Sequence, residues 1–139
     1  MVADGCEVGA MADTSKPVSI LIVEDDALVA ACINDLLAEM GFFVVGIATS
    51  APEAISLLGD ATPDLALIDI RLSGPIDGID LACRLRQEFA IPAIFLSGVI
   101  DPDIARRAQA AQPLGLLQKP FLPSEVFNAI ERASIIREI

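Results

Sequence analysis

Polar residues of a few types stand at the ends of four short aliphatic runs in this sequence. In chain order they are Glu24-Asp25-Asp26, Asp69, Ser97 and Lys119. Acidic clusters bind Mg²⁺, usually through one or two carboxylates, with water and phosphate oxygens completing the octahedron. A lysine and a hydroxyl nearby supply hydrogen-bond donors for a phosphate. If the four groups converge in the fold, they indicate a site for magnesium and a phosphoryl group.

Each of the four groups also has an ordinary structural explanation when it is taken alone. Acidic residues often cap helices, a serine often begins a loop, and a lone lysine is usually solvated. The combination is harder to explain, because two carboxylates about 4 Å apart repel by roughly 4 kcal/mol at an effective dielectric of 20. A purely structural cluster would avoid that cost, so the set favours a functional site.

The elements that position these groups follow from the pattern of apolar residues. Short aliphatic runs alternate with longer amphipathic stretches, which is typical of repeated βα units. The expected strands are Val18–Val23, Phe42–Ala48, Leu65–Asp69, Ala93–Ser97 and Leu116–Gln118. Ligands of an open α/β sheet bind beyond the carboxyl ends of its strands. All four polar groups are therefore expected at one edge of the sheet.

Five helices are expected to alternate with these strands. Apolar residues at spacings of three and four predict one over Ala27–Met40, which Gly41 ends, and the capping-box pattern Ser50-Ala-Pro-Glu53 opens the second. The third carries Leu81 and Leu85, Asp101-Pro102 opens the fourth, and Ser124 begins the last. The predicted fold class is α/β, with a doubly wound, five-stranded parallel sheet flanked by five helices.

Length and composition narrow the possible functions. A chain of 139 residues suits one domain, which we expect at residues 18–139 after a flexible extension, residues 1–17. The net charge of −11 would repel nucleic acids and anionic membranes. The absence of histidine removes serine-histidine hydrolysis and histidine-ligated zinc. No run is long enough to span a membrane and no secretory signal is evident, so a cytoplasmic location is expected.

Five blocks in the sequence resemble the receiver domains of response regulators in two-component signalling, in the right order and over essentially all of residues 18–139. The blocks are Ile20-Leu-Ile-Val-Glu-Asp-Asp26, Asp64-Leu-Ala-Leu-Ile-Asp-Ile-Arg-Leu72, Asp77-Gly78, Phe95-Leu-Ser97 and Lys119-Pro-Phe121. The resemblance implies a flavodoxin-like fold of the receiver type and a stand-alone, single-domain regulator. It also implies that Mg²⁺ is the cofactor.

The resemblance assigns a role to each residue at the sheet edge. Asp69 would be the phosphoacceptor, Asp25 a direct magnesium ligand and Glu24 a ligand through water. The backbone carbonyl of Arg71 would be a further ligand. Ser97 and Lys119 would contact the phosphoryl oxygens, and the Lys119-Pro120 peptide bond would be cis.

The donor implied by the resemblance is a phosphohistidine on a sensor histidine kinase or on a histidine phosphotransfer protein. The domain would assist its own phosphorylation and dephosphorylation without being an enzyme in the ordinary sense. Since no sequence follows the last expected helix to form an output module, the signal is expected to pass to an unknown downstream protein. A phosphate sink that drains a kinase is an alternative.

Two further functions use the same sequence differently. One is a phosphorylation-independent interaction module, which would form a homodimer through the helix after Asp101, the strand Leu116–Gln118 and the last helix. The apolar Ile135, Ile136 and Ile139 are compatible with such a face. The other is an aspartate-nucleophile phosphatase, which the sequence disfavours because no Asp-x-Asp pair begins at Asp69.

Two features depart from the family pattern, and a further prediction concerns the packing of two cysteines. The loop from Asp69 to Asp77 is one residue longer than usual, with Ser73 where proline is common. Leu116 stands where many members carry an aromatic residue, and a partly buried strand residue is expected there. Cys32 and Cys83 fall in apolar helical patterns and are expected to be small core residues.

Overall fold

The computed structural model describes residues 17–59 and 62–138, with side chains described as far as residue 134. Most of the predicted extension, residues 1–17, therefore lies outside the described residues, as do the side chains of Ile135, Ile136 and Ile139. The elements in chain order are β1 (Ser19–Val23), α1 (Ala27–Glu39), β2 (Phe43–Ala48), α2 (Ala51–Leu57), β3 (Leu65–Asp69), α3 (Gly78–Phe89), β4 (Ala93–Ser97), α4 (Pro102–Ala110), β5 (Gly115–Gln118) and α5 (Pro123–Glu138). Both ends of every predicted strand lie within one residue of these bounds. So do the predicted end of α1 at Met40 and the predicted start of α5 at Ser124.

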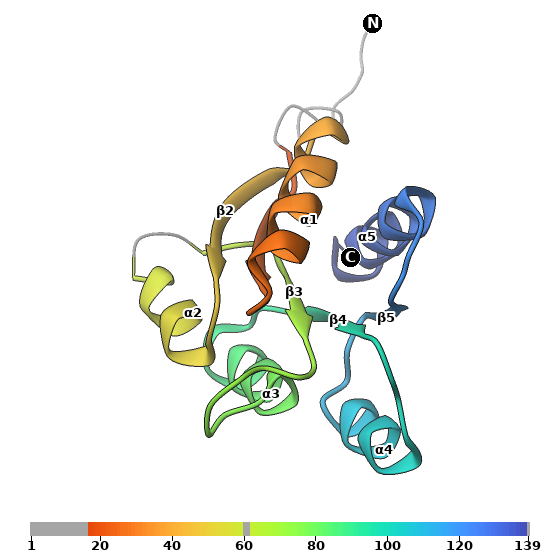
Figure 1. Cartoon of the computed structure of the whole chain (residues 1–139). Coiled ribbons are helices and arrows are strands. Elements are labelled where there is room, and N and C mark those ends of the chain that lie inside the picture. Colours follow the sequence, from red (N-terminus) through yellow and green to blue (C-terminus); the bar gives the residue numbers. More distant parts are fainter. Residues whose placement is uncertain (1–16, 60–61, 139) are drawn as a thin grey trace, which may run out of the picture.

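The strands form one parallel sheet in the order β2-β1-β3-β4-β5. Helices cover both faces, α1 and α5 on one and α2, α3 and α4 on the other (Figure 1). The chain leaves β1 in one direction towards β2 and returns on the other side as β3, so the switch point lies between β1 and β3. The predicted doubly wound fold is confirmed.

Side chains that alternate along each strand build a core on either side of the sheet. In β1, Ile20 and Ile22 pack with α1 and α5, while Leu21 and Val23 pack with α2 and α3. All five residues of β3 are buried, and so are all five of β4. A strand buried on both faces needs a continuous apolar run, which is what the sequence provides.

Local sequence fixes where α1 begins and ends. The Asp26 carboxylate caps the helix by accepting hydrogen bonds from the backbone N–H groups of Leu28 and Val29, at 3.0 and 3.2 Å. The helix stops before Gly41, whose φ of +89° is a left-handed conformation that glycine adopts without strain. Asp26 is thus a capping residue, whereas the side chains of its neighbours Glu24 and Asp25 are available for a site at the sheet edge.

Two local predictions are confirmed only in part. Cys32 is exposed, because the inward stripe of α1 runs through Ala30, Ile33 and Leu37 instead. Cys83 on α3 is half-buried and packs against the core, as expected. The expected capping box at α2 is also altered. Ser50 does accept from the Glu53 N–H at 3.3 Å, but the Glu53 carboxylate reaches back to the N–H and hydroxyl of Thr49, at 2.6 and 2.8 Å.

The part of the chain that the structure describes contains no helix that is both long and apolar enough to cross a membrane.

An ion pair ties α4 to the beginning of α3. Arg107 on α4 donates to Asp77 Oδ2 at 2.9 Å, and Asp77 Oδ1 caps α3 by accepting from the Asp80 N–H at 2.9 Å. Burial alone would raise the pKa of Asp77, but the hydrogen bonds from Asp80 and Arg107 outweigh it and lower the pKa. The carboxylate form of Asp77 therefore stabilises the fold.

Substituting Asp77→Asn should keep the helix cap and remove the charge that faces Arg107. Because the pKa of Asp77 is lowered by folding, its contribution is present above the unfolded value of about 4 and is lost as the pH falls through the folded value. We expect the variant to be less stable by about 1 kcal/mol at neutral pH. Urea unfolding followed by circular dichroism should show this difference shrinking near pH 3. An equal difference at both pH values would contradict the role of the charge.

Candidate functional site

The register of the strands brings the predicted groups together at the carboxyl edge of the sheet. Val23 of β1 pairs with Ile68 of β3, so that Glu24 and Asp69, one step further along each strand, stand side by side. On the other side of β3, Asp69 pairs with Leu96 of β4, and Ser97 pairs with Gln118 of β5. Lys119 follows directly, and its backbone N–H donates to the Ser97 carbonyl at 2.7 Å.

Lys119 joins two acidic groups across the switch point. Its ammonium group donates to Glu24 Oε1 at 2.9 Å and to Asp69 Oδ2 at 3.2 Å. Glu24 is 1% exposed and Asp69 is 7% exposed, so both carboxylates are removed from water. Removing the Lys119 ammonium would leave these two buried carboxylates without a counter-charge, which is strongly unfavourable. The peptide bond between Lys119 and Pro120 is cis.

Burial and neighbouring charges shift the pKa values of Glu24 and Lys119. Burial raises the pKa of Glu24, the hydrogen bond from Lys119 opposes that increase, and the neighbouring Asp69 carboxylate adds to it. Burial acts to lower the pKa of Lys119, but the hydrogen bond to Glu24 and the negative charges of Asp69 and Glu24 outweigh it and raise the pKa. Lys119 is therefore held in its charged form.

A third carboxylate completes an arrangement that fits a divalent cation. Glu24, Asp25 and Asp69 each offer one carboxylate oxygen, and these oxygens lie within 4.8 Å of one another. The cluster holds three carboxyl groups, and Lys119 pairs with two of them, Glu24 and Asp69. Oxygen ligands in this number suit Mg²⁺, which binds through one or two carboxylates and keeps several waters. The residues present fit that ion.

The loop after β3 is fixed to the phosphoacceptor candidate by its backbone. Asp69 Oδ1 accepts a hydrogen bond from the Arg71 N–H at 3.0 Å, and the Arg71 side chain is exposed. The Gly78 N–H donates to the Ile70 carbonyl at 2.9 Å, so the first residue of α3 lies directly against the end of β3. The predicted use of the Arg71 carbonyl as a metal ligand stays a prediction.

Ser97 lies at the same edge, but within the described part of the chain its hydroxyl makes no hydrogen bond to the acidic cluster. It is 1% exposed, and its hydroxyl donates to the Val99 carbonyl within its own loop at 3.1 Å. Leu116 on β5 is 45% exposed, which is more open than the partly buried position expected from the sequence. As an edge strand β5 has a neighbour on one side only, which leaves this side chain uncovered.

One contact at the site was not predicted. The Ser73 hydroxyl donates to Asp25 Oδ2 at 2.8 Å, and the Ser73 N–H donates to the same oxygen at 3.2 Å. The sequence marks Ser73 only as a departure from a common proline. A side chain 48 residues away in the chain gives no local signal of such a contact.

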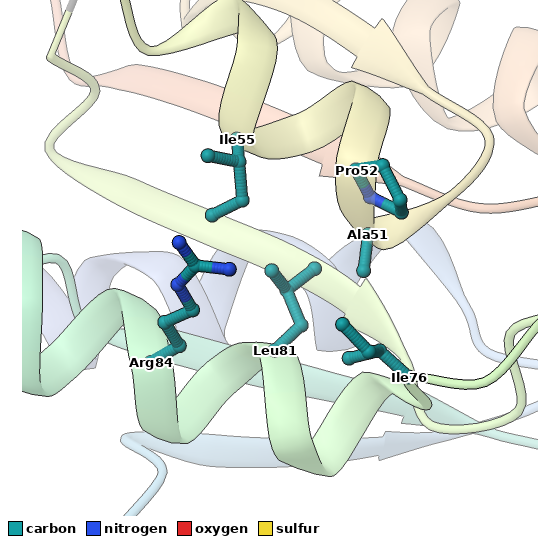
Figure 2. A pocket seen from close by; sticks show the side chains of 6 residues that line it. All are labelled: Ala51, Pro52, Ile55, Ile76, Leu81 and Arg84. Atoms are coloured by element: carbon teal, nitrogen blue, oxygen red, sulfur yellow. The ribbon is translucent and has the colours of Figure 1, made fainter.

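A hollow with a different lining lies between α2 and α3. It measures about 290 Å³ and is lined by Ala51, Pro52, Ile55, Ile76, Leu81 and Arg84 (Figure 2). Its walls are apolar apart from Arg84, whose guanidinium pairs with Glu88 at 3.2 Å. This lining lacks the oxygen ligands that a cation needs, so the acidic edge is the candidate site.

Comparisons with known proteins agree with the geometry. A family model described as the response regulator receiver domain matches residues 20–131. The transcriptional regulatory protein PdtaR of Mycobacterium tuberculosis is 36% identical over 129 residues, which cover 92% of this chain and 62% of that protein. The phyllosphere-induced regulator PhyR of Methylorubrum extorquens is 29% identical over 133 residues, which cover 95% of this chain and 49% of that protein.

Solved structures give the same result. The signal receiver domain of a modulated diguanylate cyclase from Desulfovibrio desulfuricans matches with a TM-score of 0.84 and 34% identity, covering 88% of this chain and 98% of that chain. The similarity to PdtaR and PhyR is partial, because this chain spans 62% and 49% of their lengths.

Proposed function

The chain belongs to the response regulator receiver domain family of two-component signalling, and from this premise we propose that Asp69 accepts a phosphoryl group from a partner protein. The donor would be a phosphohistidine on a sensor histidine kinase or on a histidine phosphotransfer protein. The observation that carries the proposal is the convergence of Glu24, Asp25, Asp69 and Lys119 at the switch point of the sheet. The phosphorylated domain would then signal through protein contacts.

In the proposed reaction a carboxylate oxygen of Asp69 attacks the phosphorus in line. The P–N bond to the donor imidazole breaks, and its electron pair stays on that ring nitrogen. Bound Mg²⁺, held by Glu24, Asp25 and Asp69, would neutralise negative charge on the transferring group. Lys119 is already within 3.2 Å of Asp69 Oδ2, so its ammonium can pair with a phosphoryl oxygen after a small movement.

In the proposed mechanism, Ser97 links the site to the surface. Its hydroxyl is bonded to the Val99 carbonyl, so turning it towards a phosphoryl oxygen would break that 3.1 Å hydrogen bond. The loop between β4 and α4 would then be free to change shape. This loop leads into α4, whose surface, together with that of β5, is the output surface that we propose.

Two other functions remain alternatives. A phosphate sink would use the same chemistry and differ only in lacking a downstream target. An interaction module that works without phosphate, as a homodimer through α4, β5 and α5, would not need the acidic cluster. Crowding buried carboxylates around Lys119 costs electrostatic energy, and a function that uses the acidic cluster explains why the cost is borne. The crowding therefore favours the phosphoacceptor over the interaction module.

The proposal is tested by incubating the protein with acetyl phosphate and Mg²⁺ and recording intact-mass spectra over time. We expect a phosphoryl adduct that requires Mg²⁺, that EDTA prevents, and that decays because acyl phosphates hydrolyse. Glu24→Gln and Asp25→Asn should each raise the Mg²⁺ concentration at which the adduct forms. A protein that binds its partners but gains no adduct would favour the interaction module. Continued release of phosphate from simple esters would favour the phosphatase.

A further inference from the structure

The three acidic residues of the site are held in different ways. Glu24 and Asp69 are buried, and both accept hydrogen bonds from Lys119. Asp25 is more exposed, and within the described part of the chain its carboxylate accepts hydrogen bonds from Ser73 only. An exposed aspartate that lacks such donors would sample several rotamers.

Both hydrogen bonds from Ser73 end on the same atom, Asp25 Oδ2, at 2.8 Å from the hydroxyl and 3.2 Å from the N–H. Two donors on one carboxylate oxygen fix the position of that oxygen and the plane of the group. No other described residue donates to Oδ1, so this second oxygen is left available as a ligand atom. A proline at position 73 would offer neither donor, because it lacks both a hydroxyl and a backbone N–H.

We propose that Ser73 is a positioning residue for the magnesium site, which holds the Asp25 carboxylate ready to bind the cation. The inference rests on the proposed function, since it concerns the same site. Ser73 acts through Asp25, and within the described part of the chain it makes no hydrogen bond to Asp69 or Lys119. Ordering a ligand before binding removes an entropic cost from the binding step, so the effect should be on affinity for the metal.

The backbone of the longer loop makes the contact possible. Gly74 follows Ser73 with φ at +101°, a left-handed conformation that turns the chain immediately after the donor. Open space surrounds the position of a Cβ at Gly74, so packing does not dictate this turn. The loop therefore presents both Ser73 donors towards the chain segment after β1.

The test is the dissociation constant for Mg²⁺, measured by isothermal titration calorimetry on the unphosphorylated full chain. Ser73→Ala should weaken binding by about fivefold, because one of the two donors is lost. Ser73→Thr keeps both donors and should stay within about twofold of the wild type. Ser56→Ala, on the exposed side of α2, is the matched control and should bind as the wild type does.

A double-mutant cycle separates positioning from a general effect on the fold. In an Asp25→Asn background, Ser73→Ala should change Mg²⁺ affinity by less than about twofold, because Ser73 acts only through the lost carboxylate. Thermal unfolding without Mg²⁺ should be the same for Ser73→Ala and the wild type. A full loss in the Asp25→Asn background would overturn the inference.

Other outcomes are equally decisive. Equal or tighter Mg²⁺ binding by Ser73→Ala would mean that Ser73 does not prepare Asp25 for the cation, and the proposed function would stand without it. A wild-type chain that binds no Mg²⁺ would overturn the inference and the proposed magnesium site together.

Discussion

Asp69→Asn is expected to leave the protein without a phosphoryl adduct after treatment with acetyl phosphate and Mg²⁺, at least about a hundredfold below the wild type. Asparagine has nearly the same shape, and its side-chain oxygen can still accept from the Arg71 N–H, which lies at 3.0 Å from Oδ1 in the wild type. It lacks the negatively charged carboxylate oxygen that we propose as the nucleophile. Intact-mass spectra of the two proteins, recorded side by side, measure the difference.

The stability of Asp69→Asn serves as the control for correct folding of this variant. Asp69 shares Lys119 with Glu24, so removing its charge leaves Lys119 paired at 2.9 Å with the more buried carboxylate. Repulsion within the acidic cluster also falls, and the variant should be at least as stable as the wild type without metal. Loss of the adduct together with unfolding would not support the assignment. An adduct of normal yield on Asp69→Asn would contradict it directly.

Gly78→Ala is expected to have the largest effect on stability among the glycine positions of the described chain. A Cβ at Gly78 would lie 2.0 Å from the backbone oxygen of Asp69 and 2.9 Å from the Cα of Ile70. Both atoms belong to the backbone next to the buried end of β3, so neither can move aside as a flexible side chain would. We expect a loss of about 3 kcal/mol or more in the free energy of unfolding, measured in urea.

Gly59→Ala provides the matched control. At Gly59, near the end of α2, a Cβ would meet only the Ser56 backbone oxygen, at an ordinary 3.6 Å. This variant should be unchanged or more stable by up to about 1 kcal/mol, because alanine restricts the unfolded chain. Because Gly78 lies directly against the backbone of Asp69, Gly78→Ala should also lower the yield of the phosphoryl adduct under conditions where the variant stays folded. Equal stability of the two variants would contradict the close approach of α3 to β3.

The fold was predictable because its strongest signals are local. Continuous aliphatic runs such as Leu65–Asp69 and Ala93–Ser97 can be read as buried parallel strands, and Gly41 marks a helix end. The convergence of Glu24, Asp69 and Lys119 also followed from the sequence, since parallel strands place their carboxyl ends at one edge. Family resemblance then supplied roles that spacing alone did not distinguish.

What the sequence did not predict depends on contacts between distant segments. The bond from Ser73 to Asp25 joins residues 48 apart, and the pair of Arg107 with Asp77 joins residues 30 apart. Cys32 was misplaced because its spacing fits an apolar stripe, although the face that packs on the sheet is rotated towards Ala30 and Ile33. Periodicity places a residue near a face but does not fix which neighbours cover it.

The order of the strands also has a consequence for how the chain folds. Each pair of neighbouring strands is parallel, so a helix or a long crossover separates them in sequence and none can close as a hairpin. Strand β1 gains its second neighbour only when the central strand β3, ending at Asp69, is present. Half of the chain must therefore be available before the buried centre forms, and folding should be slower than in a helical bundle of this size. Because Lys119 follows β5, the candidate site at the sheet edge is complete only when the last strand is in place.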